Sequence, residues 1–373
     1  MEFIDLGRQY DRVKEEMDAA IHKTLQDRHF IMGPEVKELE EKLAAYVGRK
    51  HCLTCSSGTS ALILPLMAYG LHKEDAVFVS SFTYFASAEV VALTGGTPVF
   101  VDSDETYNMD PKDLEARIQW IVKEGRLKPR GIIAVNIFGL MADYDEIERI
   151  AKKYDMFLLT DDAQSFGASY KGRKSCSVGD VSATSFFPAK PLGCYGDGGA
   201  VFTDDDDLYE LMHSLRVHGH GASKYDNVRI GINARLDTMQ AAVLLVKLGL
   251  LDDERAKKNQ LRERYDARLK GYYETPVIPE GRETALAQYT ILARNEEHRQ
   301  KVVEGMKARG IPVMIYYQNP MHMETAFASL GYNPADVPKA YEFSRRVLSL
   351  PMHAYMKEEE FEKIVSALIE LAK

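Results

Sequence analysis

Apolar side chains recur at helical spacing near the start of the chain. Between Gln9 and Arg28 they fall three to four residues apart on one helical face, which predicts one amphipathic helix. A second predicted helix begins at Pro34, because proline is favoured in the first helical turn, and ends at Gly48, a common C-terminal stop. The sequence therefore predicts two helices ahead of the first strand.

Short apolar runs then alternate with amphipathic segments. Most of these runs are apolar throughout, which is typical of strands buried on both faces of a sheet. The predicted strands are His51–Cys55, Ala76–Ser80, Pro98–Asp102, Gly131–Asn136, Met156–Thr160, Val181–Phe186 and Gly199–Thr203. Helical periodicity fills intervals such as Leu114–Val122 and Tyr144–Tyr154. We therefore expect an α/β fold with a mostly parallel, seven-stranded sheet flanked by helices.

The pattern changes after Leu236. A long helical stretch runs from Asp237 to about Leu269, and shorter strand-like and helical segments follow it. These segments are Gln288–Ala293, His298–Ala308, Val313–Tyr317 and Glu358–Ala372. They predict a smaller C-terminal α/β domain, with residues 1–250 forming the large domain and residues 251–373 the small one.

Composition and charge narrow the possible function classes. The 373 residues are 45% hydrophobic and carry a formal net charge of −9, which is typical of a globular protein and unfavourable for a general nucleic-acid binder. The apolar runs are too short to span a membrane, and the first residues lack the apolar core of a signal peptide. Four cysteines in so long a chain do not make a disulfide framework. We therefore expect a cytoplasmic protein that binds neither nucleic acid nor a membrane.

Two residue pairs superficially resemble metal sites. Cys52 and Cys55 have the C-x-x-C spacing of zinc and redox sites, but no second pair of this kind follows in the sequence. His218 and His220 lie in a glycine-rich segment without a third ligand at useful spacing. We interpret the cysteines as small residues of a buried strand and the histidines as part of a loop near the substrate or a partner subunit. The sequence therefore predicts no metal site.

Three segments that follow predicted strands carry the candidate chemistry. Ligands of parallel sheets bind beyond the carboxyl ends of the strands, so a site is expected there. The segment Ser56–Leu62 combines small hydroxyl residues with Gly58 at a helix start, which suits a phosphate group. Asp161 follows the fifth strand. Lys190 follows the sixth, among aromatic, proline and glycine residues where burial can lower the pKa of a lysine.

These three elements supply what pyridoxal 5′-phosphate requires. The helix start holds the phosphate, the carboxylate keeps the pyridine nitrogen protonated, and the lysine carries the aldehyde as a Schiff base and then moves protons. The glycine-rich motifs of dinucleotide-binding and P-loop proteins do not occur in the sequence. The pattern therefore favours a pyridoxal-phosphate enzyme with Lys190 and Asp161 as its catalytic residues.

The chain also resembles a known family, the DegT/DnrJ/EryC1/StrS sugar aminotransferases. The segments that carry the resemblance are Ser57–Leu62, Asp161–Gly167, Ser185–Gly193 and Asn233–Ala242. The likeness runs from Phe3 to His353 and implies a fold-type I aminotransferase that works as a homodimer with shared active sites. It also implies glutamate as the amino donor and pyridoxamine phosphate as the intermediate form of the cofactor. Dehydratases of this fold replace the lysine with histidine, so Lys190 argues against that activity.

The resemblance further implies a role for each cofactor-binding residue. Gly58, Thr59 and Ser185 would hold the phosphate, Tyr84 would stack on the ring, Asp161 would pair with the pyridine nitrogen, Gln164 would contact the phenolic oxygen, and Asn233 would reach the phosphate of the neighbouring subunit's cofactor. A second acid, Asp162, stands beside Asp161, and the spacing to Gln164 favours Asp161 as the residue that faces the ring.

The expected substrate is a nucleotide-linked keto sugar, used in the biosynthesis of surface-polysaccharide amino sugars. The sequence Arg235–Asp237 is similar to that of family members that aminate the C3 ketone of a nucleotide-linked hexose. The runs Ser185–Gly199 and Ala287–Thr290 are most similar to enzymes that act on UDP-2-acetamido-2-deoxy-3-oxo-glucuronate. Alternatives are dTDP-3-oxo-6-deoxyhexoses, 4-keto nucleotide sugars, and a regulatory or sugar-binding protein without turnover. The candidate substrate-binding residues are Arg235, Tyr316, Tyr317 and His322, and Tyr316 stands where many relatives carry histidine.

Overall fold

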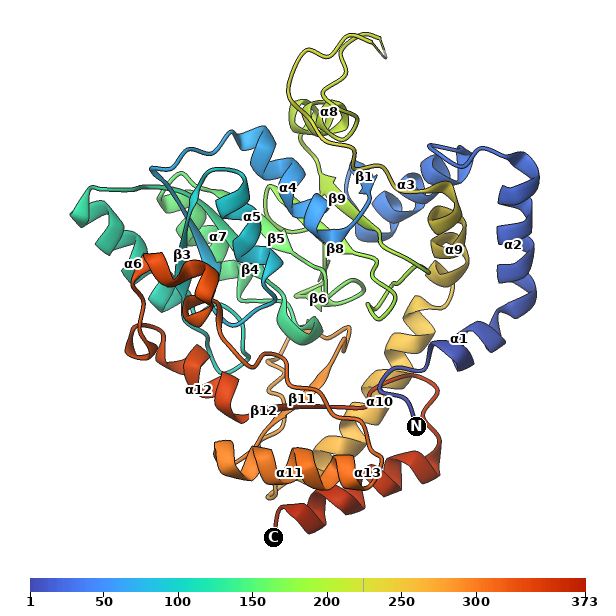
Figure 1. Cartoon of the computed structure of the whole chain (residues 1–373), viewed down its shortest axis with the longest axis vertical. Coiled ribbons are helices and arrows are strands. Elements are labelled where there is room, and N and C mark those ends of the chain that lie inside the picture. Colours follow the sequence, from blue (N-terminus) through green and yellow to red (C-terminus); the bar gives the residue numbers. More distant parts are fainter. Residues whose placement is uncertain (224) are drawn as a thin grey trace.

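A seven-stranded sheet forms the centre of the protein in the computed structural model, which describes residues 1–223 and 225–373 (Figure 1). The strand order is β1-β9-β8-β5-β4-β2-β3. The strands are β1 (His51–Cys55), β2 (Asp75–Ser80), β3 (Thr97–Val101), β4 (Lys128–Val135), β5 (Phe157–Asp161), β8 (Val181–Ser185) and β9 (Gly199–Thr203). Strand β9 is antiparallel to both of its neighbours, and the other pairs are parallel. The predicted mostly parallel sheet is therefore confirmed.

Helices flank this sheet and extend beyond it into the C-terminal region (Figure 1). They are α1 (Leu6–Arg12), α2 (Lys14–Asp27), α3 (Pro34–Val47), α4 (Gly58–Tyr69), α5 (Ala86–Leu93), α6 (Pro111–Glu124), α7 (Tyr144–Lys153), α8 (Asp206–Leu215), α9 (Thr238–Leu248), α10 (Leu251–Leu269), α11 (Glu296–Ala308), α12 (Pro338–Arg346) and α13 (Glu358–Leu371). Four short 3-10 helices are η1 (Ile137–Gly139), η2 (Met321–Met323), η3 (Thr325–Leu330) and η4 (Pro334–Asp336).

Two small antiparallel sheets complete the fold. One has the strand order β10-β6-β7, and the other pairs β11 with β12. The bounds of these strands are β6 (Ser169–Tyr170), β7 (Arg173–Lys174), β10 (Arg282–Glu283), β11 (Tyr289–Leu292) and β12 (Val347–Leu350). Strand β10 pairs with β6. This pairing brings residues beyond position 280 beside the segment that follows β5 in the sequence.

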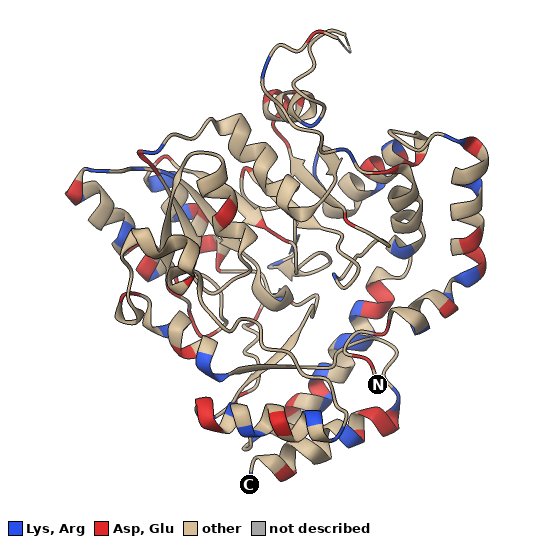
Figure 2. Cartoon of the chain, in the orientation of Figure 1, with Lys and Arg blue, Asp and Glu red and all other residues tan. Residues whose placement is uncertain are grey.

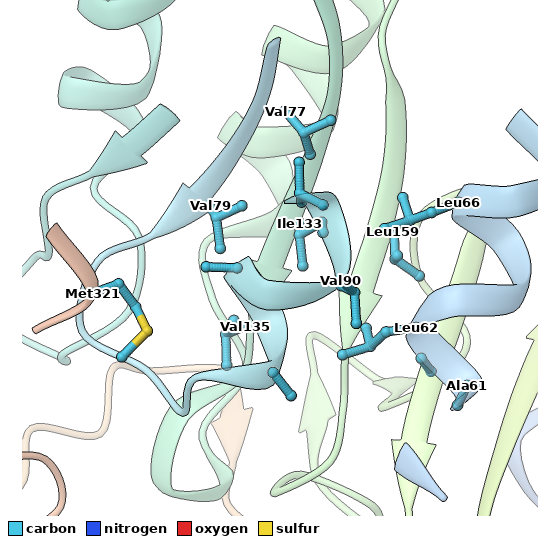
Figure 3. Packing of buried hydrophobic residues seen from close by; sticks show 14 of the residues in the cluster. Ala61, Leu62, Leu66, Val77, Val79, Val90, Ile133, Val135, Leu159 and Met321 are labelled. Carbon is cyan, nitrogen blue, oxygen red and sulfur yellow. The ribbon is translucent and has the colours of Figure 1, made fainter. Parts of the chain in front are cut away.

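Side chains of the central strands point alternately to the two faces of the sheet, which divides the core into two layers. On β2, Val77 and Val79 pack in one cluster together with α4 and α5, whereas Ala76 and Phe78 pack in another with α6 and α7. Figure 3 shows the first layer, in which Val77 and Val79 lie with residues of β4, β5 and both helices. Successive side chains of a strand point to opposite faces, so apolar residues at every position bury both faces of the sheet.

The C-terminal region has a hydrophobic cluster of its own. Its members lie between Leu261 and Leu371 and come from α10, α11, α13 and the β11–β12 pair. The N-terminal segment also contacts this region, because the Met352 N–H donates to the Phe3 carbonyl and the Arg8 guanidinium pairs with Glu360 at 2.7 Å. A domain boundary near residue 250 stays a prediction.

Two predicted helices are each divided in the structure. The segment Gln9–Arg28 is broken at Val13, where α1 ends and α2 begins. In α1, Arg8 binds Glu360 of α13 and Gln9 binds Glu254 of α10. Helix α2 instead packs on α9, so the two halves of the predicted helix contact different parts of the protein. Likewise, the stretch from Asp237 to Leu269 is divided between α9 and α10 at residues 249–250.

The prediction of a strand over Val313–Tyr317 is wrong. In this segment only Met314 pairs with another chain segment, through an isolated bridge to Ser349. Strand β12, which the periodicity did not predict, takes the place beside β11 instead. Tertiary pairing decides such cases, because both segments are short and apolar and their local patterns do not differ.

Charged side chains lie mainly on the outer helices, and the central strands carry few (Figure 2). No helix among residues 1–223 and 225–373 is long and apolar enough to cross a membrane. Within the same part of the chain, no group of three or more His, Cys, Asp or Glu side chains is arranged to hold a metal ion. Cys52 and Cys55 are both buried but pack in different clusters, so their side chains leave β1 on opposite faces.

Candidate active site

The carboxyl ends of the central strands border a pocket of about 530 Å³. Most of the predicted site residues line it, although they come from distant parts of the sequence. These residues are Gly58, Thr59, Tyr84, Asp161, Gln164, Ser185, Lys190, Tyr316 and Tyr317. The parallel sheet brings most of them together because they follow or end strands whose carboxyl ends lie at this edge, while Tyr316 and Tyr317 reach the pocket from the C-terminal region.

One end of the pocket is built for an anion. Helix α4 begins at Gly58, and the first helical hydrogen bond runs from the Ala61 N–H to the Ser57 carbonyl, which leaves the N–H groups of Gly58 and Thr59 ahead of it. A Cβ atom on Gly58 would lie 2.6 Å from the Ser185 Cβ, so only glycine allows this close approach. The helix N-terminus and the Ser185 hydroxyl therefore face the same small space, which suits a phosphate.

The turn that follows β5 directs the side chains of Asp161 and Asp162 to different parts of the protein. Asp161 lines the pocket and accepts hydrogen bonds from the Ser87 hydroxyl at 2.8 Å and from the Ala163 N–H at 3.1 Å. Burial raises its pKa. The nearby charge of Lys190 lowers this pKa, but no described cation forms an ion pair with the carboxylate, so Asp161 suits a positively charged partner such as a protonated ring nitrogen.

The Asp162 carboxylate points away from the pocket and is already satisfied. It is fully buried and accepts hydrogen bonds from four side chains, Asn136, Thr160, Ser165 and Ser175. The Asn136 amide, in turn, accepts a hydrogen bond from the Tyr144 hydroxyl at 2.8 Å. Asp162 therefore holds the turn in place, and Asp161 is the acid that faces the pocket.

Gln164 joins the pocket to the C-terminal region. Its Oε1 accepts a hydrogen bond from the Phe138 N–H at 2.7 Å, and its Nε2 donates to the Tyr317 hydroxyl at 2.9 Å. Tyr317 lies edge-on to Phe82 and tilted against Tyr84, which fixes the position of its ring. This chain of contacts places two tyrosine rings, Tyr84 and Tyr317, against the same pocket.

Lys190 lies in the segment after β8. Its backbone N–H donates to the Phe187 carbonyl at 2.8 Å, which forms a tight turn. Burial lowers the pKa of its amine, and the nearby charge of Asp161 acts in the opposite direction. Among residues 1–223 and 225–373 no hydrogen bond uses the Lys190 amine, so it is available to react. A lysine whose pKa is lowered in this way is more readily neutral and nucleophilic.

Three predicted site residues do not line this pocket. Asn233 and Arg235 lie at the base of a segment, residues 217–223 and 225–233, that projects from the body of the protein beside α8 (Figure 1). The Arg235 Nε is buried without a partner among the described residues. His322 is buried outside the pocket, and its Nδ1 lies 2.7 Å from the Ser81 hydroxyl. Their roles toward a ligand stay predictions.

The structure adds residues that the sequence did not single out. Ser87 supports Asp161 from within α5, and no local pattern distinguishes it from other helical serines. Gln288 lines the pocket, and its Oε1 is buried without a partner among the described residues. It belongs to the run Ala287–Thr290, whose similarity to known enzymes was a usable signal. Asp197, in the glycine-rich turn before β9, also lines the pocket.

Comparison with known proteins identifies the family. The model of the DegT/DnrJ/EryC1/StrS aminotransferase family matches residues 11–369. The chain belongs to this family. The resemblance read from the four motif segments is therefore confirmed, as is the expectation of an aminotransferase fold.

Relatives and solved structures match the chain from end to end. The UDP-2-acetamido-2-deoxy-3-oxo-D-glucuronate aminotransferase of Pseudomonas aeruginosa is 43% identical and covers 99% of both chains. A pleiotropic regulatory protein of Geobacillus stearothermophilus is 38% identical, covering 98% of this chain and 97% of that protein. The crystal structure of a DegT DnrJ EryC1 StrS aminotransferase from Brucella abortus has a TM-score of 0.96 at 47% identity and covers 99% of both chains.

Family membership establishes the reaction class and the cofactor. Aminotransferases of the DegT/DnrJ/EryC1/StrS family depend on pyridoxal 5′-phosphate. The residues present fit this group, because the Gly58–Ser185 approach provides a cradle for its phosphate and no described cation forms an ion pair with the Asp161 carboxylate. The protein is therefore a pyridoxal-phosphate-dependent sugar aminotransferase that takes a nucleotide-linked keto sugar and an amino donor.

Proposed function

We propose that this protein transfers the amino group of L-glutamate to the C3 ketone of UDP-2-acetamido-2-deoxy-3-oxo-glucuronate. The observation that carries the proposal is the 43% identity to an aminotransferase named for that substrate, which extends over 99% of both chains. We also propose that this acidic protein acts in the cytoplasm, in the biosynthesis of surface-polysaccharide amino sugars.

The cofactor would be held by the residues that converge on the pocket. The N–H groups of Gly58 and Thr59 and the Ser185 hydroxyl are placed to donate to the phosphate. Asp161 is placed to keep the ring nitrogen protonated, because a buried carboxylate is stabilised by a cation beside it. When bound, the cofactor supplies the electron sink that makes a proton next to the amino group acidic.

Lys190 would carry out the proton transfer. Its amine, with a pKa lowered by burial, accepts the proton from the Cα atom of the amino donor and later returns a proton to the sugar carbon that receives nitrogen. Tyr84 lies on the pocket wall and would stack on the cofactor ring, while Gln164, which also lines the pocket, would contact the phenolic oxygen. Tyr316 and Tyr317 would form the wall for the sugar, since burial raises their pKa values and keeps both phenols neutral.

A homodimer would complete the site. Asn233 and Arg235 do not reach the pocket of their own chain, but they lie at the base of the projecting segment. Exposed apolar side chains lie on this segment and beside its base: Phe30, Ile31, Met32, Val228 and Ile230. An apolar surface of this kind is typical of a subunit interface. We therefore place Asn233 at the phosphate and Arg235 at the sugar acid or nucleotide phosphate of the partner's site.

The test of the proposed reaction follows the nitrogen atom. Purified protein loaded with pyridoxal phosphate is incubated with ¹⁵N-glutamate and a C3-keto UDP sugar acid, and the product is analysed by mass spectrometry. We expect ¹⁵N in the sugar and 2-oxoglutarate as the second product, with Lys190→Ala as the inactive control. Amination of a C4-keto sugar but not of the C3-keto sugar would contradict the proposal.

Two other functions have named relatives. A transaminase named for dTDP-3-amino-3,4,6-trideoxy-alpha-D-glucose is 34% identical over the whole chain, so a dTDP-linked 3-keto sugar is the second candidate substrate. A regulatory role is favoured by the 38% match to the pleiotropic regulatory protein. The labelling experiment separates these functions, because a dTDP sugar tested in parallel would be aminated in the first case, whereas none of the keto sugars, C4-keto sugars included, would be aminated in the second.

A further inference from the structure

A second, smaller cavity shares the Lys190 segment with the substrate pocket. Its volume is about 40 Å³, and it lies between the N-terminal segment, α10 and the residues that follow β12. Ala189 and Lys190 line both this cavity and the substrate pocket. The segment that carries the reactive amine is therefore a wall between two cavities, only one of which is large enough for a substrate.

Two residues that line the smaller cavity, Gln9 and His353, have buried polar atoms without partners among the described residues. His353 is 5% exposed, and neither its Nδ1 nor its Nε2 has a hydrogen-bond partner among the described residues. The Gln9 Oε1 is also buried without a partner in this part of the chain, although the Gln9 Nε2 donates to both carboxylate oxygens of Glu254 at 3.0 Å. Three unpartnered polar atoms thus belong to two residues that line one cavity.

The charged neighbours do not supply the missing partners, because they are bound to other groups. Glu254 accepts hydrogen bonds from Gln9 and from the Tyr355 hydroxyl. The Lys258 amine donates to the Ala285 carbonyl at 2.7 Å and to the Leu286 carbonyl at 3.2 Å. Asp5 accepts from the Arg8 N–H at 2.9 Å. A further group is needed to satisfy His353 and Gln9.

Water has the required size and chemistry. A buried polar atom without a hydrogen bond loses its hydration without compensation, so native proteins rarely leave three together. A polar cavity needs only about 10–15 Å³ of space and two to four polar partners to hold a water molecule. Burial lowers the pKa of His353, which favours the neutral ring, with one nitrogen donating and the other accepting. A water molecule can pair with both.

We propose that this cavity binds a small cluster of ordered water molecules, held by His353 and Gln9, which solvates the Lys190 segment from the side away from the substrate. His353 is then a positioning residue that acts through water and touches neither substrate nor cofactor. The Lys190 amine keeps part of its solvation when a substrate fills the larger pocket. This inference goes beyond the proposed amino transfer and does not depend on which sugar is used.

Charged and titratable groups surround the Lys190 segment on both sides. On the substrate side these are Asp161, Asp197, Tyr84, Tyr316 and Tyr317. On the water side they are Asp5, Glu254, Lys258, His353 and Tyr355. A change at His353 that keeps the ring volume but removes its polar atoms leaves all the other groups in place, so it isolates the effect of the water.

The test measures the Lys190 amine directly in the cofactor-free protein. Its rate of acylation by acetic anhydride is followed from pH 6 to 11 by mass spectrometry of the Lys190 peptide, and the midpoint gives its apparent pKa. We expect His353→Phe to expel the water and to lower this midpoint by about one unit, a tenfold increase in the neutral amine at a given pH below it. His353→Gln, which keeps polar atoms at the cavity, leaves the midpoint near that of the wild type.

His298→Phe is the matched control. His298 is also buried with an unpartnered Nε2, but it lies on α11 and lines neither cavity, so this variant leaves the Lys190 midpoint unchanged. An unchanged midpoint in folded His353→Phe overturns the proposal. If that variant does not fold, a high-resolution crystal structure of the wild type decides, because water within hydrogen-bond distance of His353 and Gln9 supports the proposal and a dry cavity overturns it. Failure of the amino-transfer assay affects neither measurement.

Discussion

Asp161 and Asp162 are neighbours in the chain, yet they lie in two different regions of the molecule. Asp162 lies in the protein interior beneath the turn that follows β5, where four side chains donate to its carboxylate. Asp161 lies at the pocket above the turn, where two groups donate to it and no described cation forms an ion pair with it. Identical side chains thus have opposite functions, because the number of partners decides whether a buried carboxylate stabilises the fold or awaits a ligand.

The same contrast distinguishes the polar groups of the two regions. Around Asp162, the Asn136 side chain donates to the Asp162 carboxylate and accepts from the Tyr144 hydroxyl, so these polar groups pair with one another in a closed network. In the pocket, the Lys190 amine has no hydrogen-bond partner among the described residues, and the Gln288 Oε1 is unpartnered as well. A network in which the polar groups pair with one another rigidifies a structure, whereas polar groups at a cavity that lack a hydrogen-bond partner are available to a ligand. Four substitutions test this difference.

The largest effect is expected at Lys190. Lys190→Ala removes the group that moves the proton, and positioned proton transfer contributes about 10²–10⁴-fold to a rate, so amino transfer falls by at least about 10³-fold. The thermal unfolding temperature changes little, because the removed amine makes no hydrogen bond among the described residues. Steady-state rates with glutamate and the keto sugar give the first result, and calorimetry gives the second. Activity within tenfold of the wild type would refute a catalytic role.

Asp161→Asn comes next and separates activity from stability. We expect kcat to fall by about 10²-fold, because electrostatic stabilisation of the ring nitrogen is lost. The cofactor-free protein should not become less stable. Burial raises the pKa of Asp161, so the folded state holds a proton that the unfolded state releases, and the wild type loses stability as the pH rises through this window. The stability of the variant relative to the wild type therefore increases with pH above about 4. Urea unfolding at several pH values checks the sign.

Asp162→Asn is expected to show the reverse behaviour. It replaces a carboxylate that accepts four hydrogen bonds with an amide that cannot accept them all, so the free energy of unfolding falls by about 3 kcal/mol. Any residual folded protein keeps Asp161 and Lys190 and still binds pyridoxal phosphate. Urea unfolding measures the loss, and cofactor titration of the folded fraction measures the binding. If Asp162→Asn lost activity at full stability, the assignment of the two acids would have to be exchanged.

The smallest effect is expected at Gln288. Gln288→Leu removes a buried amide that lines the pocket, and we expect kcat/KM for the keto sugar to fall about tenfold, as for the loss of one hydrogen bond. Fold stability stays the same or rises slightly, because an unpartnered polar atom leaves the interior. Kinetics with each substrate varied in turn shows which one the amide contacts. A stability loss without a kinetic change would assign Gln288 to the fold.

Much of this architecture follows from the sequence itself. The continuous apolar runs of β2 and β4 predict strands buried on both faces, and therefore a parallel sheet with its site at the carboxyl ends of the strands. The same logic identifies Gly58, Asp161 and Lys190, because each lies shortly after a predicted strand and is a residue type suited to one part of the cofactor. These inferences need only local pattern and chain order.

Other features were decided by tertiary structure alone. The break at Val13 arises because α1 binds the C-terminal helices while α2 packs on α9, and no local residue signals it. The support of Asp161 by Ser87, the closure of the network around Asp162 and the cavity beside His353 join segments that lie far apart in the chain. Sequence determines which groups are apolar, charged or reactive. Only packing decides which polar atoms find partners, because that depends on distances between segments that no local pattern encodes.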